Sequence, residues 1–101
     1  MSNTKAKVGF YGAVDAVTGS NFLFEAQGKR IMIDCGLYQG DLFADDRNRE
    51  DFAVDPASID VLLVTHAHID HIGRIPKFVR DGFHGVIYST PPTHELTEIM
   101  L

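Results

Sequence analysis

Three histidines and one aspartate lie within six residues, His66 to His71 (HAHIDH), directly after a short apolar run. The run, Asp60 to Thr65 (DVLLVT), is typical of a β-strand that is covered on both faces. The polar window therefore begins where a strand ends, at a sheet edge where α/β proteins tend to place functional sites. This order of segments constrains the chain to a fold in which a sheet edge presents a histidine-rich loop.

The segments before this window predict an antiparallel meander of three strands. Lys7 to Val14 opens with apolar Val8 and Phe10 alternating with Lys7 and Gly9, and Phe22 to Phe24 is a short apolar run that ends at polar Glu25. The residues Gln27 to Lys29 have the composition of a hairpin turn, and Arg30 to Asp34 predicts the next strand. From Leu37 to Ala57 the chain becomes polar and charged, which is typical of a solvated loop.

The segments after the window alternate between helix and strand. Pro76 to Asp81 predicts a short helix that Gly82 terminates, and Gly85 to Ser89 predicts another buried strand. A last helix follows, with Thr93 as its expected N-cap, whereas His66 to Gly73 is expected to be a loop. A meander followed by strand–helix units indicates a mixed α+β or α/β fold with helices on at least one face of a sheet.

Length and composition indicate a small globular unit. The chain has 101 residues, of which 45% are hydrophobic and 23% charged, and its net charge is −5, so it lacks the signature of a disordered chain. No apolar run approaches the roughly 18 residues of a membrane span, and the start lacks a signal-peptide stretch, which predicts a cytoplasmic protein. The final segment PTHELTEIML has no helix-stop signal, so we expect residues 1–101 to be the N-terminal part of a domain in a longer protein.

The side chains of the window are suited to bind divalent metals. In an extended segment His66 and His68 point the same way and can converge on one ion, while Asp70 and His71 lie further along and can face a second ion. Imidazole and carboxylate groups accept zinc, iron and manganese. The single cysteine, Cys35, excludes a cysteine-based zinc site and is expected to be a small buried residue, so the window favours a catalytic centre.

The window HAHIDH resembles the H-x-H-x-D-H signature of the metallo-β-lactamase superfamily. Several flanking segments resemble its RNA-processing branch, the β-CASP nucleases, which are related to the polyadenylation cleavage factor. The resemblance covers nearly the whole chain from Gly9 onward. The flanking segments are Val17 to Ser20 (VTGS), Asp34 to Gly40 (DCGLYQG), His71 to Pro76 (HIGRIP) and Ser89 to Thr93 (STPPT).

The resemblance implies the fold and the ligands of the site. The fold would be the N-terminal portion of an αββα sandwich, and the family normally holds two zinc ions, with iron or manganese left open as the metal. His66 and His68 would bind the first ion and Asp70 and His71 the second, with Asp70 and His71 as the catalytic residues. Asp34 would accept hydrogen bonds that orient the histidine-rich loop.

The activity implied by the resemblance is hydrolysis of RNA. A water that bridges the two metals would lose a proton near neutral pH and attack the phosphorus of a phosphodiester. The family's further metal ligands and its β-CASP insertion lie downstream, and His84 and His94 occur in the wrong contexts to replace those ligands. The chain alone is therefore expected to bind metal weakly and to turn over no substrate.

Two other functions are left open by the sequence. The same metal site could hydrolyse a lactam or a thioester, or the protein could be a scaffold subunit without catalysis. RNA is the expected partner, a membrane is not, and a homo-oligomer is left open. Arg47 and Asn48 could touch substrate, but their charged surroundings favour a solvated loop.

Overall fold

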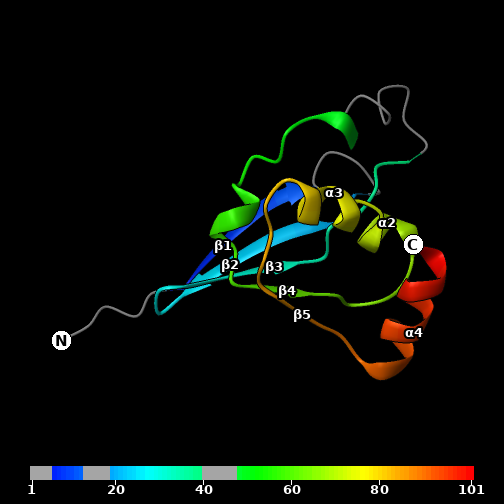
Figure 1. Cartoon of the computed structure of the whole chain (residues 1–101). Helices are drawn as coiled ribbons and strands as arrows, with labels where there is room; N and C mark the ends of the chain where they lie inside the picture. The colour runs from blue at the N-terminus through cyan, green and yellow to red at the C-terminus, as the bar shows by residue number, and fades with distance from the viewer. Residues whose placement is uncertain (1–5, 13–18, 40–47) are drawn as a thin grey trace.

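The computed structural model describes residues 6–12, 19–39 and 48–101. The strands are β1 (Lys7–Gly12), β2 (Asn21–Ala26), β3 (Lys29–Ile33), β4 (Val61–Leu63) and β5 (Val86–Tyr88). The helices are α2 (Ile69–Ile72), α3 (Ile75–Arg80) and α4 (Pro91–Met100), with the short 3₁₀ helix η1 at Pro56–Ser58. The strands form one sheet in the order β1-β2-β3-β4-β5. Figure 1 shows α3 along one face of the sheet, and α2 and α4 near the end where β3, β4 and β5 finish.

β1, β2 and β3 form the predicted antiparallel meander. β1 pairs with β2, and β2 pairs with β3, both in antiparallel orientation. Gln27 and Gly28 turn the chain between β2 and β3 with φ angles of 51° and 77°, the left-handed conformations that a tight hairpin turn requires. The predicted first strand extends to Val14, but positions 13–18 lie outside the described residues, so it is confirmed up to Gly12.

β3, β4 and β5 form the parallel half of the sheet. β3 pairs in parallel with β4, and β4 in parallel with β5. α2 and α3 lie in the connection between β4 and β5, and η1 precedes β4. Parallel neighbours need such crossover connections, whereas antiparallel neighbours can be joined by a tight turn. This mixed sheet with helices confirms the predicted fold class.

The buried core lies between one face of the sheet and α3. Leu23, Met32 and Leu62 are paired across β2, β3 and β4, and none of them is more than 1% exposed. Ile72 of α2 and Phe78 of α3 are 0% exposed and belong to the same cluster. Burial of a side chain of this size contributes about 1.5–3 kcal/mol. The core therefore fixes α3, and α2 directly before it, to the sheet.

The opposite face of the sheet, which we call the outer face, carries two apolar rows across all five strands. The prediction that β4 and β5 are buried on both faces is wrong, because Leu63, Val86 and Tyr88 point to the outer face and are 38%, 52% and 56% exposed. The outer face consists of Phe10, Phe22, Ile33, Leu63 and Tyr88 in one row and Val8, Phe24, Ile31, Val61 and Val86 in the other.

Two predictions about helices need correction. The window predicted as a loop contains α2, which starts directly after His68. α4 starts after Thr90 and not after Thr93, because Pro91 and Pro92 occupy its first positions, where a helix needs no N–H donor. The helix predicted from Pro76 to Asp81 is confirmed as α3. Within the part of the chain that the structure describes, no helix is long and apolar enough to cross a membrane.

Candidate metal centre

Three segments meet where β3 and β4 end. Asp34 directly follows β3, and His66 and His68 lie shortly after β4. α2 carries Asp70 and His71. Because β3 and β4 are parallel neighbours, their carboxyl ends lie at the same edge of the sheet. The topology thus brings all five predicted site residues to one end of the sheet.

Backbone hydrogen bonds from distant segments hold α2 in place. The N–H of Cys35 donates to the carbonyl oxygen of His71 at 2.9 Å, and the N–H of Ser20 donates to the carbonyl oxygen of Asp70 at 3.0 Å. A helix of four residues has no independent stability in water. These bonds therefore determine where Asp70 and His71 lie.

Gly36 lies at the closest approach between α2 and the segment after β3. Its N–H donates to the carbonyl oxygen of Ser20 at 2.9 Å, and a Cβ on Gly36 would lie 1.6 Å from the carbonyl oxygen of Asp70. A residue with any side chain is therefore excluded from this position. The family-like segments around Ser20 and Gly36 serve to position α2, although their parts at positions 17, 18 and 40 lie outside the described residues.

Asp34 is the buried anchor of the site. Its backbone has a left-handed φ of 61°, and the residue is 2% exposed. Its Oδ1 accepts a hydrogen bond from the N–H of Thr65 at 2.7 Å, and its Oδ2 accepts one from Thr65 Oγ1 at 2.7 Å. Oδ2 also lies 2.6 Å from His71 Nδ1. With the proton on Nδ1, His71 donates this bond and leaves the lone pair of Nε2 free to bind a metal.

His66, Asp70 and His71 bring their ligand atoms together, with one atom from each within 4.8 Å of the others. His71 Nε2 lies 3.5 Å from Asp70 Oδ2, and the rings of His66 and His71 are 3.7 Å apart between centroids. His68 is not part of this group, and its ring packs edge-on against that of His66 at 4.7 Å. The group contains His66, which is expected to bind the first ion, and Asp70 and His71, which are expected to bind the second. The assignment of these ligands to two ions therefore stays a prediction.

The donors of this group fit a divalent metal. The side chains of Asp70 and His71 are 28% and 20% exposed, which leaves the site open to water and substrate. Cys35 is buried as expected, and burial raises the pKa of its thiol to about 12. The thiol is therefore neutral at physiological pH, and Cys35 is not part of the group formed by His66, Asp70 and His71.

The remaining histidines lie apart from this group. His84 Nδ1 lies 3.0 Å from the carbonyl oxygen of Gly82, and His94 Nε2 lies 2.9 Å from Glu98 Oε1. Both side chains are exposed, as expected for surface histidines. Arg47 lies outside the described residues.

Asn48 is not the solvated loop residue that the charge pattern favours. Its Oδ1 accepts a hydrogen bond from the N–H of Tyr38 at 2.7 Å, and its Nδ2 donates to the carbonyl oxygen of Tyr38 at 2.9 Å. The local sequence could not show this contact, because Tyr38 lies ten residues earlier in the chain. Asn48 therefore fixes its segment to the chain that leads from Asp34.

The sequence family described as the metallo-beta-lactamase superfamily matches residues 14–101. The chain belongs to this superfamily. Ribonuclease TTHA0252 of Thermus thermophilus is 47% identical over 91 residues, which cover 90% of this chain and 21% of that protein. The transcription termination factor FttA of Methanosarcina mazei is 36% identical, over 88% of this chain and 14% of the factor. Cleavage and polyadenylation specificity factor subunit 3-II of Arabidopsis thaliana is 36% identical, over 89% of this chain and 16% of the subunit.

Solved structures share the fold. The metallo-beta-lactamase fold protein YhfI from Bacillus subtilis superposes with a TM-score of 0.60 at 24% identity, over 96% of this chain and 42% of YhfI. The chemotaxis sensor ODP, in its peroxy diiron form, gives a TM-score of 0.53 at 22% identity, over 87% of this chain and 35% of the sensor. At these identities the likeness concerns the fold alone.

These comparisons confirm the resemblance to the superfamily and to its RNA-processing β-CASP branch. The metallo-β-lactamase fold implies binding of a divalent metal, and the group formed by His66, Asp70 and His71 is where this chain offers ligands. The chain spans about a fifth or less of the length of these curated relatives.

Proposed function

We propose that the protein containing this chain is a metal-dependent ribonuclease that hydrolyses phosphodiester bonds of RNA. The hydrogen bond between His71 Nδ1 and the buried Asp34 carries the proposal, because it frees His71 Nε2 beside Asp70 and His66. A buried carboxylate behind a histidine is the usual means of orienting a metal ligand. The 47% identity to a ribonuclease supports RNA as the substrate.

The residues at this site have different roles in the proposed reaction. His66, Asp70 and His71 would hold a divalent metal, with His68 adjacent to them. A metal held there supplies Lewis-acid stabilisation of the phosphoryl oxygens and makes water a nucleophile near neutral pH. Asp34 keeps the proton of His71 on Nδ1, and the partly exposed carboxylate of Asp70 accepts a hydrogen bond from the attacking water and so orients it toward phosphorus.

Zinc is the metal that we propose. Histidine nitrogens combined with a carboxylate, and an open position for water, are typical of catalytic zinc sites. Iron and manganese accept the same donors, and elemental analysis distinguishes the three metals. Residues 1–101 would supply the first part of the ligand set, since they correspond to 21% of the ribonuclease. The protein would act in the cytoplasm, which cell fractionation tests.

Elemental analysis and RNA cleavage by the full-length protein test the proposal. We expect His66→Ala and Asp70→Ala each to lower bound zinc and to abolish cleavage, because each variant removes a donor atom. His84→Ala is the matched control, since His84 is an exposed histidine outside the group and should change neither property. Cleavage that survives in Asp70→Ala would contradict the mechanism. A wild-type protein that binds metal and hydrolyses a lactam or thioester in place of RNA would contradict the substrate.

A further inference from the structure

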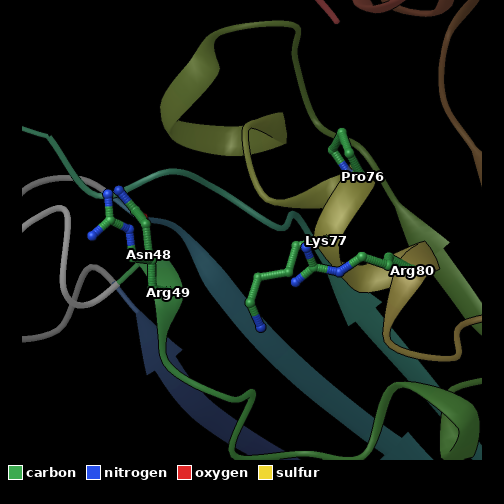
Figure 2. Close-up of a pocket in the computed structure, with 5 residues that line it drawn as sticks. All are labelled: Asn48, Arg49, Pro76, Lys77 and Arg80. Carbon is green, nitrogen blue, oxygen red and sulfur yellow. The ribbon is translucent and has the colours of Figure 1, made fainter.

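A second feature of the chain is a cationic hollow between α3 and the short segment at Asn48 and Arg49. The hollow has a volume of about 410 Å³, and its lining contains none of the histidines of the metal-ligand group. Figure 2 shows Lys77 and Arg80 extending from α3 toward the side where Asn48 and Arg49 lie. Among the described residues, those that line it are Asn48, Arg49, Pro76, Lys77 and Arg80.

Side-chain contacts beneath the hollow hold its two walls together. Both ends of the Asn48 amide are bonded to the backbone of Tyr38. The guanidinium of Arg74, which is 7% exposed, lies over the rings of Tyr38 and Phe52 at 4.7 and 5.2 Å. Lys77 Nζ lies 4.5 Å from the centre of the Phe52 ring. The wall that carries Arg49 is therefore tied to the base of α3 by packed aromatic and cationic groups.

The hollow keeps an excess of positive charge. Asp81 pairs with both cations of α3, with 2.7 Å to Lys77 Nζ and 3.3 Å to Arg80 Nε. The hydrogen bond from Lys77 lowers the pKa of the Asp81 carboxyl, so Asp81 is ionised at neutral pH. Asp81 is paired with Lys77 and Arg80 only, so among the described residues the three cations Arg49, Lys77 and Arg80 outnumber this one carboxylate. Glu50 and Asp51 are not among the described residues that line the hollow.

The positive charge of the hollow contrasts with the net charge of −5 of the whole chain. The side chain of Arg80 is 72% exposed and Arg49 is also exposed, so both guanidinium groups are accessible to a ligand. Lys77, at 15% side-chain exposure, contributes its charge from beneath them. Guanidinium groups bind phosphate oxygens through paired N–H donors. Carboxylate groups elsewhere on this acidic chain would repel a phosphate.

We propose that this hollow binds backbone phosphates of single-stranded RNA outside the cleavage site. The proposal rests on the proposed ribonuclease function. α3, which carries Lys77 and Arg80, begins three residues after the end of α2, which carries Asp70 and His71. A polymeric substrate carries further phosphates on either side of the scissile one. Phe52 is partly buried beneath Lys77 and is not a stacking platform, so the contacts hold RNA without reading its sequence.

RNA binding as a function of salt tests the proposal. The anisotropy of a fluorescein-labelled single-stranded RNA is measured with the full-length protein and with its Arg49→Ala/Arg80→Ala variant, with a chelator present so that the RNA stays intact. We expect the variant to bind about tenfold more weakly near 100 mM salt and its log–log salt slope to be shallower by about 1.4, for two lost phosphate contacts. Lys7→Ala/Lys29→Ala is the matched control, because it removes the same charge from exposed positions on the hairpin.

Each outcome decides the proposal. An equal loss of affinity in both double variants would show unspecific attraction and overturn it, as would unchanged binding in Arg49→Ala/Arg80→Ala. Inorganic phosphate or pyrophosphate that competes as well as RNA, phosphate for phosphate, would overturn it in favour of a small-molecule site. Arginine-dependent RNA binding in a full-length protein that does not cleave RNA would reject the ribonuclease function and leave the RNA-binding hollow standing.

Discussion

At the scale of single residues, Asp34 positions the side chains of the candidate metal centre. Its Oδ1 accepts a hydrogen bond from the N–H of Thr65, and its Oδ2 accepts one from Thr65 Oγ1 and lies 2.6 Å from His71 Nδ1. Thr65 leads into the histidine-rich window, and His71 lies on α2. One carboxylate therefore connects the two segments that carry the ligands. Asp34 itself is not among the grouped ligands, so it is a positioning residue.

We expect Asp34→Asn to lower the free energy of unfolding by roughly 1–3 kcal/mol. The NH₂ group of the new Asn replaces an oxygen that accepts a hydrogen bond, and therefore faces a hydrogen-bond donor. Asn tolerates left-handed φ, so the backbone conformation is kept. Zinc affinity should fall about 10- to 100-fold. Urea unfolding and competition with a chromophoric chelator measure the two effects. Asp55→Asn is the control, because Asn replaces an Asp N-cap with little cost. Unchanged zinc affinity in Asp34→Asn would contradict the positioning role.

Cys35 makes stability depend on pH in the alkaline range. Burial raises its thiol pKa from 9.0 to about 12. Above pH 9 the unfolded chain loses this proton while the folded chain keeps it, so the stability present below pH 9 declines as the pH rises toward about 12. We expect a loss of about 1.4 kcal/mol per pH unit in this window. Urea unfolding across it should show a steeper decline for the wild type than for Cys35→Ala. Parallel declines would contradict a raised pKa.

At the scale of elements, α2 depends on residues far away in the sequence. The strands and α3 could be predicted from apolar spacing and from Pro76, because those signals lie within each element. α2 could not, since its carbonyl oxygens are bonded by Ser20 and Cys35. The spacing of the histidine-rich window predicts four candidate ligands, and the turn of α2 decides that His66 groups with Asp70 and His71 while His68 does not. Exposure of β5 likewise depends on which elements cover the sheet, and no local pattern encodes this.

We expect Gly36→Ala to displace α2 and to lower the free energy of unfolding by roughly 3–5 kcal/mol, because the new Cβ meets the Asp70 carbonyl at 1.6 Å. Metal affinity should fall as well, because α2 carries Asp70 and His71. Gly28→Ala is the control, since that position has a φ of +77° but nothing within 4 Å of a Cβ. Its cost should stay near 1 kcal/mol. Urea unfolding of both variants measures the difference, and equal costs would show that the close contact relaxes freely.

At the scale of the whole molecule, the outer face of the sheet exposes apolar side chains to solvent. Its two rows are apolar at every position across the five strands. Phe10 and Phe22 pack against each other at 5.6 Å between ring centroids, yet Phe10 is 64% exposed. Contiguous apolar surfaces of this kind mark places where another protein layer packs. The core between the sheet and α3 holds the chain together, while the outer face favours association.

We expect the isolated 101-residue chain to self-associate through this face and to bind an apolar dye. Sedimentation equilibrium should give a mass that rises with concentration, because burial of apolar area contributes about 25 cal/mol per Å². Phe10→Lys/Val86→Lys should return the chain toward a monomer, since charges on β1 and β5 oppose stacking and edge pairing. Leu96→Lys/Ile99→Lys adds the same charge on exposed positions of α4. If only Leu96→Lys/Ile99→Lys gave a monomer, the chain would self-associate through α4 and not through the outer face.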